Sequence, residues 1–100
     1  MAQKLVDVTV NPGVDIKVND EKVKVEKGSD TIAWKSTTSN QEFQIVLPAG
    51  EPTVSCGWQG NRWVCTAGPF QNNSGQPRTI KYDVTATNAP TLDPEVEIQP

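Results

Sequence analysis

Histidine is missing from this sequence of 100 residues, methionine occurs once, as Met1, and cysteine occurs twice. Without histidine the chain cannot build a Ser-His-Asp triad, a Cys-His dyad or a His-ligated zinc, copper or haem site. A single pair of cysteines is also too small for a four-cysteine zinc or iron–sulfur site. These absences remove most classes of enzyme, so we expect a non-enzymatic module without a metal or cofactor.

A surplus of positive charge and long apolar runs are missing as well. Nine Lys and Arg side chains stand against twelve Asp and Glu, which gives a net charge of −3 and a pI near 4.8. Such a chain repels phosphate backbones, so we expect no nucleic-acid partner. The apolar runs are too short for membrane insertion, and we expect no secretory leader at the N-terminus. The length fits a single domain, 1–100.

Apolar and polar residues alternate along most of the chain. This period of two is typical of antiparallel strands with one buried face, and no stretch has the spacing of an amphipathic helix. Clusters of Gly, Pro, Asn and Asp separate the alternating runs as turns. The predicted strands are residues 6–10, 14–18, 23–25, 32–34, 43–47, 80–86 and 95–98. The sequence therefore predicts an all-β fold, a two-sheet Greek-key sandwich of about seven or eight strands.

One hairpin of this sandwich carries both cysteines. Gly60-Asn61 suits a two-residue turn with glycine at its first central position, and this turn pairs Cys56 with Cys65. The pair falls at a non-hydrogen-bonded position, where Cα atoms approach to about 4.5 Å, within reach of a disulfide. We therefore predict a Cys56–Cys65 disulfide and a periplasmic or extracellular location. The alternatives are two reduced, buried cysteines or a redox couple.

The same register pairs Trp58 with Trp63 on the face that carries the cysteines. In one interpretation both indoles cover the end of the core, because indoles bury a large apolar area. In the other they form an exposed platform for a sugar, a peptide or a protein, with Gln59, Asn61 and Arg62 supplying polar contacts. We expect the core role, with the polar residues at the exposed tip of the hairpin.

A long polar loop, residues 68–77, follows the hairpin, with Phe70 as its apolar anchor. Such loops carry function when a rigid scaffold positions them, so Phe70 is a candidate binding residue. Asn72 begins an Asn-Asn-Ser stretch that matches the N-glycosylation sequon, a pattern that is common by chance.

Three stretches of the sequence resemble cupredoxin-like domains. The first is Val23-Lys24-Val25-Glu26-Lys27-Gly28-Ser29-Asp30-Thr31-Ile32-Ala33-Trp34, a strand, a Lys-Gly turn and a strand that ends in an aromatic residue. Ile80-Lys81-Tyr82-Asp83-Val84 resembles the penultimate strand of that family. Leu92-Asp93-Pro94-Glu95-Val96-Glu97-Ile98 resembles its closing strand. The resemblance implies a cupredoxin-like sandwich, and the alternative is an immunoglobulin-like sandwich, whose disulfide usually joins two sheets over a longer span.

The copper chemistry of that family is not implied. A type 1 copper site needs two imidazoles and a thiolate in a trigonal arrangement. Here the place of the first histidine holds Asn40-Gln41-Glu42, and the place of the Cys-His-Met loop holds Asp83, Val84, Thr85 and Thr87. The resemblance therefore implies a scaffold without a metal.

Three functions are open at this point. The leading hypothesis is a metal-free, cupredoxin-like binding or structural module. The second is an inhibitor of a protease or toxin that presents the stapled loop 56–70, since a rigid loop loses little freedom on binding. The third is a carbohydrate-binding module that uses Trp58 and Trp63. Each expects a protein or carbohydrate partner, and the solvent exposure of the two indoles separates them.

Overall fold

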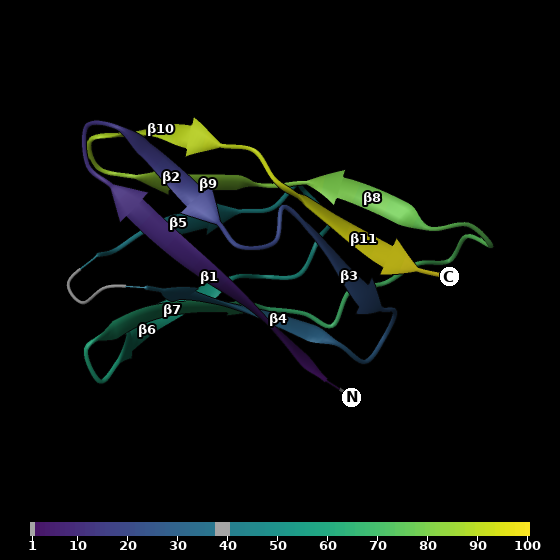
Figure 1. Ribbon diagram of the computed structural model, residues 1–100. Coiled ribbons are helices and arrows are strands. Elements are labelled where there is room, and N and C mark those ends of the chain that lie inside the picture. The colour runs from purple at the N-terminus through teal and green to yellow at the C-terminus, as the bar shows by residue number, and fades with distance from the viewer. Residues whose placement is uncertain (1, 38–40) are drawn as a thin grey trace.

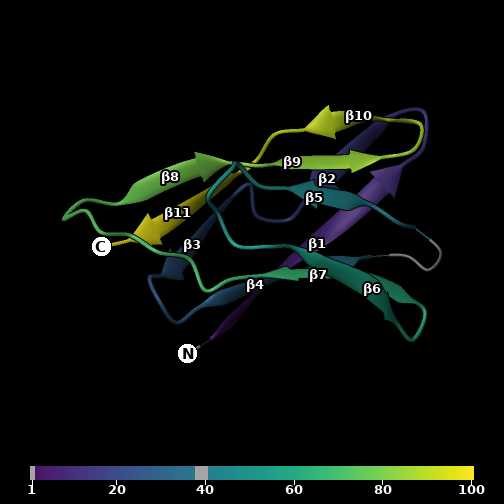
Figure 2. The same ribbon diagram turned by 180° about the vertical axis from the view of Figure 1, so that it is seen from behind.

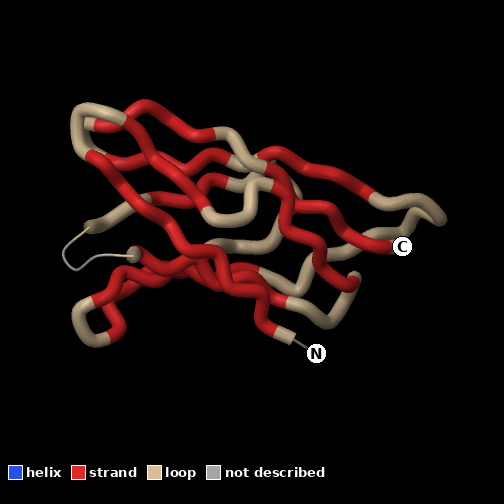
Figure 3. The backbone as a smooth tube through the Cα atoms, viewed as in Figure 1, coloured by secondary structure: helices blue, strands red, loops and turns tan. Residues whose placement is uncertain are grey.

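The computed structural model describes residues 2–37 and 41–100. These residues form β-strands and loops and contain no helix (Figure 1 and Figure 3). The strands are β1 (Gln3–Asn11), β2 (Asp15–Val18), β3 (Lys22–Glu26), β4 (Thr31–Ser36), β5 (Gln44–Val46), β6 (Ser55–Gln59), β7 (Arg62–Ala67), β8 (Arg78–Lys81), β9 (Asp83–Ala86), β10 (Ala89–Leu92) and β11 (Glu95–Gln99). The all-β prediction is confirmed.

The strands form two layers around one hydrophobic core (Figure 1 and Figure 2). One layer is a five-stranded sheet with the order β2-β1-β4-β7-β6. The other layer consists of two three-stranded sheets, β10-β9-β5 and β3-β11-β8, which lie end to end. This arrangement is a two-layer sandwich, as the alternating pattern predicts.

The chain crosses between the layers at the turn from β3 to β4. Gly28 adopts a φ of +72° there, a conformation that glycine reaches without strain. The carboxylate of Asp30 accepts hydrogen bonds from the backbone N–H groups of Glu26, at 2.9 Å, and Ala2, at 3.0 Å. The bond from Glu26 is the main reason that the pKa of Asp30 is lowered. The turn therefore delivers β4 beside β1, with which it pairs in parallel.

The observed strands exceed the predicted number at two places in the chain. The predicted strand 80–86 is divided at Tyr82, because its partner changes: β8 pairs with β11, whereas β9 pairs with β5 and β10. The N–H of Tyr82 donates to the carbonyl of Pro94, at 3.0 Å. Residues 89–92 form the additional strand β10, which the pattern missed because Ala-Pro-Thr-Leu does not alternate.

Two buried aromatic side chains join the layers. Trp34 of β4 donates its indole Nε1–H to the hydroxyl of Tyr82, at 3.0 Å, and the ring centroids lie 5.4 Å apart. Both residues are fully buried. The buried indole N–H of Trp34 therefore has the acceptor that it needs.

The environment of Tyr82 generates a pH prediction. Burial raises the pKa of Tyr82 to about 12 from an ordinary value of 10.0. The folded protein thus holds this proton more tightly than the unfolded chain, so the stabilisation is complete below pH 10.0 and is lost as the pH rises toward about 12. We expect the tyrosinate absorbance of the native protein to appear only near the upper value, with a parallel fall in the free energy of unfolding.

The sequence has one tyrosine, so the absorbance signal has a single source. A Tyr82→Phe variant is the control and should lose the fall in stability over this interval. Ionisation of the native protein at the ordinary pKa would contradict the prediction.

Candidate functional site

The hairpin of β6 and β7 has the predicted register. Trp58 lies opposite Trp63, and Cys56 lies opposite Cys65. Gly60 occupies the first position of the turn with a φ of +64°, as a turn with glycine at that position requires. The turn chemistry and the spacing of the cysteines therefore point to one pairing, and the structure confirms it.

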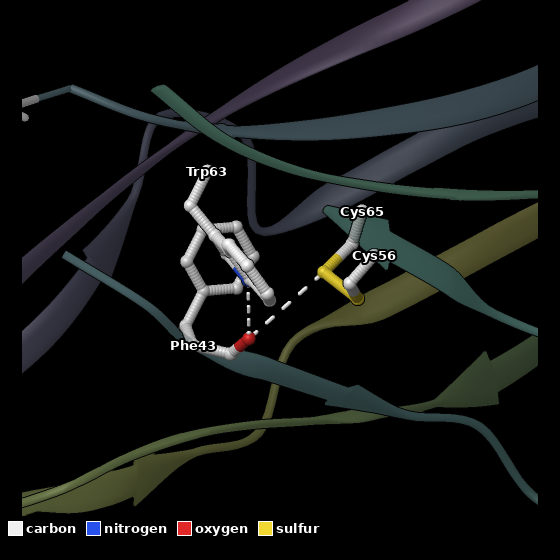
Figure 4. The surroundings of a disulfide bond; sticks show 4 residues. All are labelled: Phe43, Cys56, Trp63 and Cys65. Carbon is white, nitrogen blue, oxygen red and sulfur yellow. Dashed lines mark hydrogen bonds between the residues drawn. A yellow bond between two sulfur atoms is a disulfide. The ribbon is translucent and has the colours of Figure 1, made fainter. Parts of the chain in front are cut away.

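The two cysteines are at disulfide distance, with their sulfur atoms 2.05 Å apart and their Cα atoms 4.0 Å apart (Figure 4). The short Cα separation is typical of a non-hydrogen-bonded cross-strand pair. Cys65 is buried in the core, whereas Cys56 is exposed on the outer strand. The pair thus links the edge of the sheet to its interior, and it is compatible with an oxidising compartment.

The two tryptophans do not share one environment. The indole of Trp63 is half-buried against the core, and its Nε1–H donates to the carbonyl of Phe43, at 2.7 Å (Figure 4). Trp58 is 44% exposed. Their rings meet edge to face, with centroids 5.2 Å apart and planes at 71°. The expectation that both indoles cover the core is therefore correct for Trp63 and wrong for Trp58, because Trp58 lies on β6, the edge strand of the five-stranded sheet.

The polar residues of the hairpin lie where the sequence predicts. Gln59 and Asn61 are exposed, and so is Arg62. Arg62 is held back toward the sheet, because its Nη1 donates to the carbonyl of Ser36, at 2.9 Å. Trp58, Gln59 and Asn61 are thus the members of the candidate binding set that project from this end of the molecule. We call the surface formed by these three residues the hairpin surface.

Phe70 does not join the hairpin surface, and its prediction as a binding residue is wrong. Its side chain is fully buried, and its carbonyl accepts the N–H of Gly28, at 2.7 Å. A lone aromatic residue in a polar loop is buried here because it fastens the loop to the core. The amide of Asn72 is also buried and donates to the carbonyls of Gln76 and Ile98, each at 2.9 Å, so it is not presented for glycosylation.

β6 is the last strand of the five-stranded sheet, and within residues 2–37 and 41–100 no strand pairs with its outer side. All of its residues are exposed or half-exposed. Cys56 and Trp58 form non-hydrogen-bonded pairs with β7, so their backbone N–H and C=O groups point toward the open side. The sequence reasoning missed this open edge. The feature of the sequence that could have indicated an open edge is the run of residues 55–59, which contains neither a charged residue nor a proline.

Some of the residues that the resemblance to cupredoxins places at the expected copper position line one hollow. Gln41, Glu42 and Thr87, with Val10 and Pro12, line a hollow of about 370 Å³. The amide of Gln41 bonds both backbone groups of Val10, so it serves as a continuation of the sheet. Asn40 lies outside the described residues. Asp83, Val84 and Thr85 lie in β9.

No protein-family model matches the chain, and no curated protein matches it. Within residues 2–37 and 41–100, no three Asp, Glu or Cys side chains gather in a way that could hold a metal ion. The same residues include no helix long enough to cross a membrane.

The different environments of the indoles predict different costs of removal. Trp63→Ala removes a packed side chain and its hydrogen bond, and should lower the free energy of unfolding by about 3 kcal/mol. Trp58→Ala removes an exposed ring and one edge-to-face contact, and should cost about 1 kcal/mol. Urea denaturation of both variants with the disulfide intact measures the difference. Equal losses would show that the two indoles contribute alike.

Removing the disulfide should also lower stability. The bridge joins residues separated by 9 positions, and a loop this short contributes about 2–3 kcal/mol by loop entropy. We expect this loss in the Cys56→Ser/Cys65→Ser variant, again by urea denaturation. Reduction of the wild-type protein is the matched control and should give the same value. Two reactive thiols in the native protein would refute the bridge itself.

Proposed function

We propose that this protein is a non-enzymatic, metal-free binding module of cupredoxin-like fold that recognises a partner protein through its hairpin surface. The observation that carries the proposal is Trp58, an indole that is 44% exposed on an edge strand without charge. Exposed aromatic residues on a rigid element are the residue type that dominates the energy of protein interfaces.

Three features of the hairpin favour protein binding. The Cys56–Cys65 pair holds β6 on β7, so little ordering is needed when a partner docks. Gln59 and Asn61 are exposed beside the indole and offer neutral donors and acceptors for the rim of an interface. The backbone groups of β6 face open solvent on one side and supply a further row of hydrogen bonds.

The cupredoxin-like scaffold is supported by the placement of the matching stretches. Residues 23–34 form β3, the Gly28 turn and β4, residues 80–84 enter the divided strand β8–β9, and residues 92–98 enter β11. In the hollow where the resemblance would place copper, Gln41 and Thr87 supply neither an imidazole nor a thiolate. A periplasmic or extracellular location belongs to the same proposal and is supported by the cysteine pair.

The geometry argues against the two alternative functions, the carbohydrate-binding module and the protease or toxin inhibitor. A sugar stacks on a flat aromatic platform, whereas Trp58 and Trp63 meet at 71° and share no plane. An inhibitory loop spanning 56–70 would need a protruding segment, whereas Cys65 and Phe70 are buried in the core. We therefore place the contact at the hairpin surface and β6.

A photo-crosslinking residue at Gln59 tests the proposal in the cells that produce the protein. We expect a covalent adduct with a partner protein, because this position borders Trp58. The matched control carries the same residue at Val14, which is 68% exposed in the turn before β2. Adduct at Gln59 that disappears in Trp58→Ala supports the proposal. Equal labelling at both positions, or none at Gln59, would overturn it.

A further inference from the structure

The open side of β6 presents hydrogen-bonding groups without a partner strand. Cys56 and Trp58 direct their N–H and C=O groups away from β7, and within residues 2–37 and 41–100 these groups have no hydrogen-bond partner. An edge of this kind is a template for pairing with another strand. Proteins that keep such an edge single usually protect it with charge, proline or short length.

The other sheet edges carry these protections, and β6 does not. Charged residues or proline occupy the remaining long edges, with Lys17 in β2, Lys24 in β3, Lys81 in β8 and Pro90 in β10. The edge strand β5 is neutral but has only 3 residues. β6, with 5 residues and the sequence Ser-Cys-Gly-Trp-Gln, has neither a charge nor a proline.

We propose that β6 pairs with β6 of a second copy of this chain, antiparallel and about a two-fold axis at Gly57. The inference rests on the proposed function and names the partner of the same surface. Pairing of a strand with its own copy brings any charges of that strand near the same charges across the axis, so a charged strand would repel its copy. A strand without charge meets no such repulsion, and it offers no charge with which to select a different, charged partner.

The register follows from the direction of the backbone groups. With the axis at Gly57, Cys56 faces Trp58 of the second copy, and the outward N–H and C=O groups of both residues form four hydrogen bonds around the axis. Gly57 then faces its own copy at the close, non-hydrogen-bonded position. A Cβ at Gly57 would have no neighbour within 4 Å, so that face is open. The two five-stranded sheets become one continuous sheet, and each Trp58 gains a neighbour.

Ser55 and Gln59 provide a test of this register, because Ser55 of one chain faces Gln59 of the other. Both side chains are exposed. We expect wild-type protein to form a dimer in sedimentation equilibrium, with its disulfide intact. The variant Ser55→Lys/Gln59→Lys places two like-charge pairs across the axis and should weaken the dimer about tenfold. Ser55→Glu/Gln59→Glu should weaken it similarly, and an equimolar mixture of the two variants should recover association as a heterodimer.

The control variant is Leu5→Lys/Val14→Lys, which adds the same charge at two exposed positions outside β6. It should dimerise as the wild type does, and thermal melts should show that all variants are folded. A wild type that stays monomeric from micromolar to millimolar concentration would overturn the self-pairing. So would a dimer that the paired lysines do not weaken, or variants whose mixture does not associate.

These results are separable from those of the crosslinking experiment. A monomeric wild type together with a Trp58-dependent adduct to another protein rejects self-pairing and leaves the binding function supported. An adduct with twice the mass of the chain supports both. A dimer whose formation is independent of β6, without adduct at Gln59, rejects both.

Discussion

The hydrogen bond from Trp34 to Tyr82 ties the two layers of the sandwich together. Trp34 lies on an inner strand of the five-stranded sheet, and Tyr82 lies where the opposite layer passes from one small sheet to the next. A buried indole N–H without an acceptor costs about 1–3 kcal/mol, so each of these residues requires the other. Trp34 also lies directly opposite Cys65, which places the cysteine bridge in the same row as the central contact.

The row of Trp34, Cys65 and Cys56 also determines where the hairpin surface lies. Next to it along β7, Trp63 reaches inward to the carbonyl of Phe43 and is held by it. Trp58, one strand further out, packs against Trp63, and in the part of the chain that the structure describes no strand lies beyond β6. Its exposure is a consequence of its position on the last strand. The edge position of β6 therefore explains both the exposure of the Trp58 indole and the open backbone groups beside it.

The sequence predicted what depends on neighbouring residues along the chain. Alternation located most of the strands, and the Gly60-Asn61 turn was sufficient to pair Cys56 with Cys65. Contacts between segments that are distant in the sequence could not be predicted from this pattern. The division at Tyr82 reflects a change of partner strands, and the burial of Phe70 reflects a loop that meets the turn at Gly28. Which strand lies at an edge is likewise a property of the whole sheet, so the exposure of Trp58 could not be derived from periodicity.

The disulfide connects the stability of the core to the order of the edge. Strands with few large side chains have a weakly specified register, and in β6 Ser55 and Gly57 contribute little to it. A slip by one residue would turn Trp58 to the other face and would reverse which backbone groups point outward. Cys56 prevents this because it is bonded to Cys65, which is buried opposite Trp34. The edge is thus held in one register by a bond that is anchored in the centre of the core.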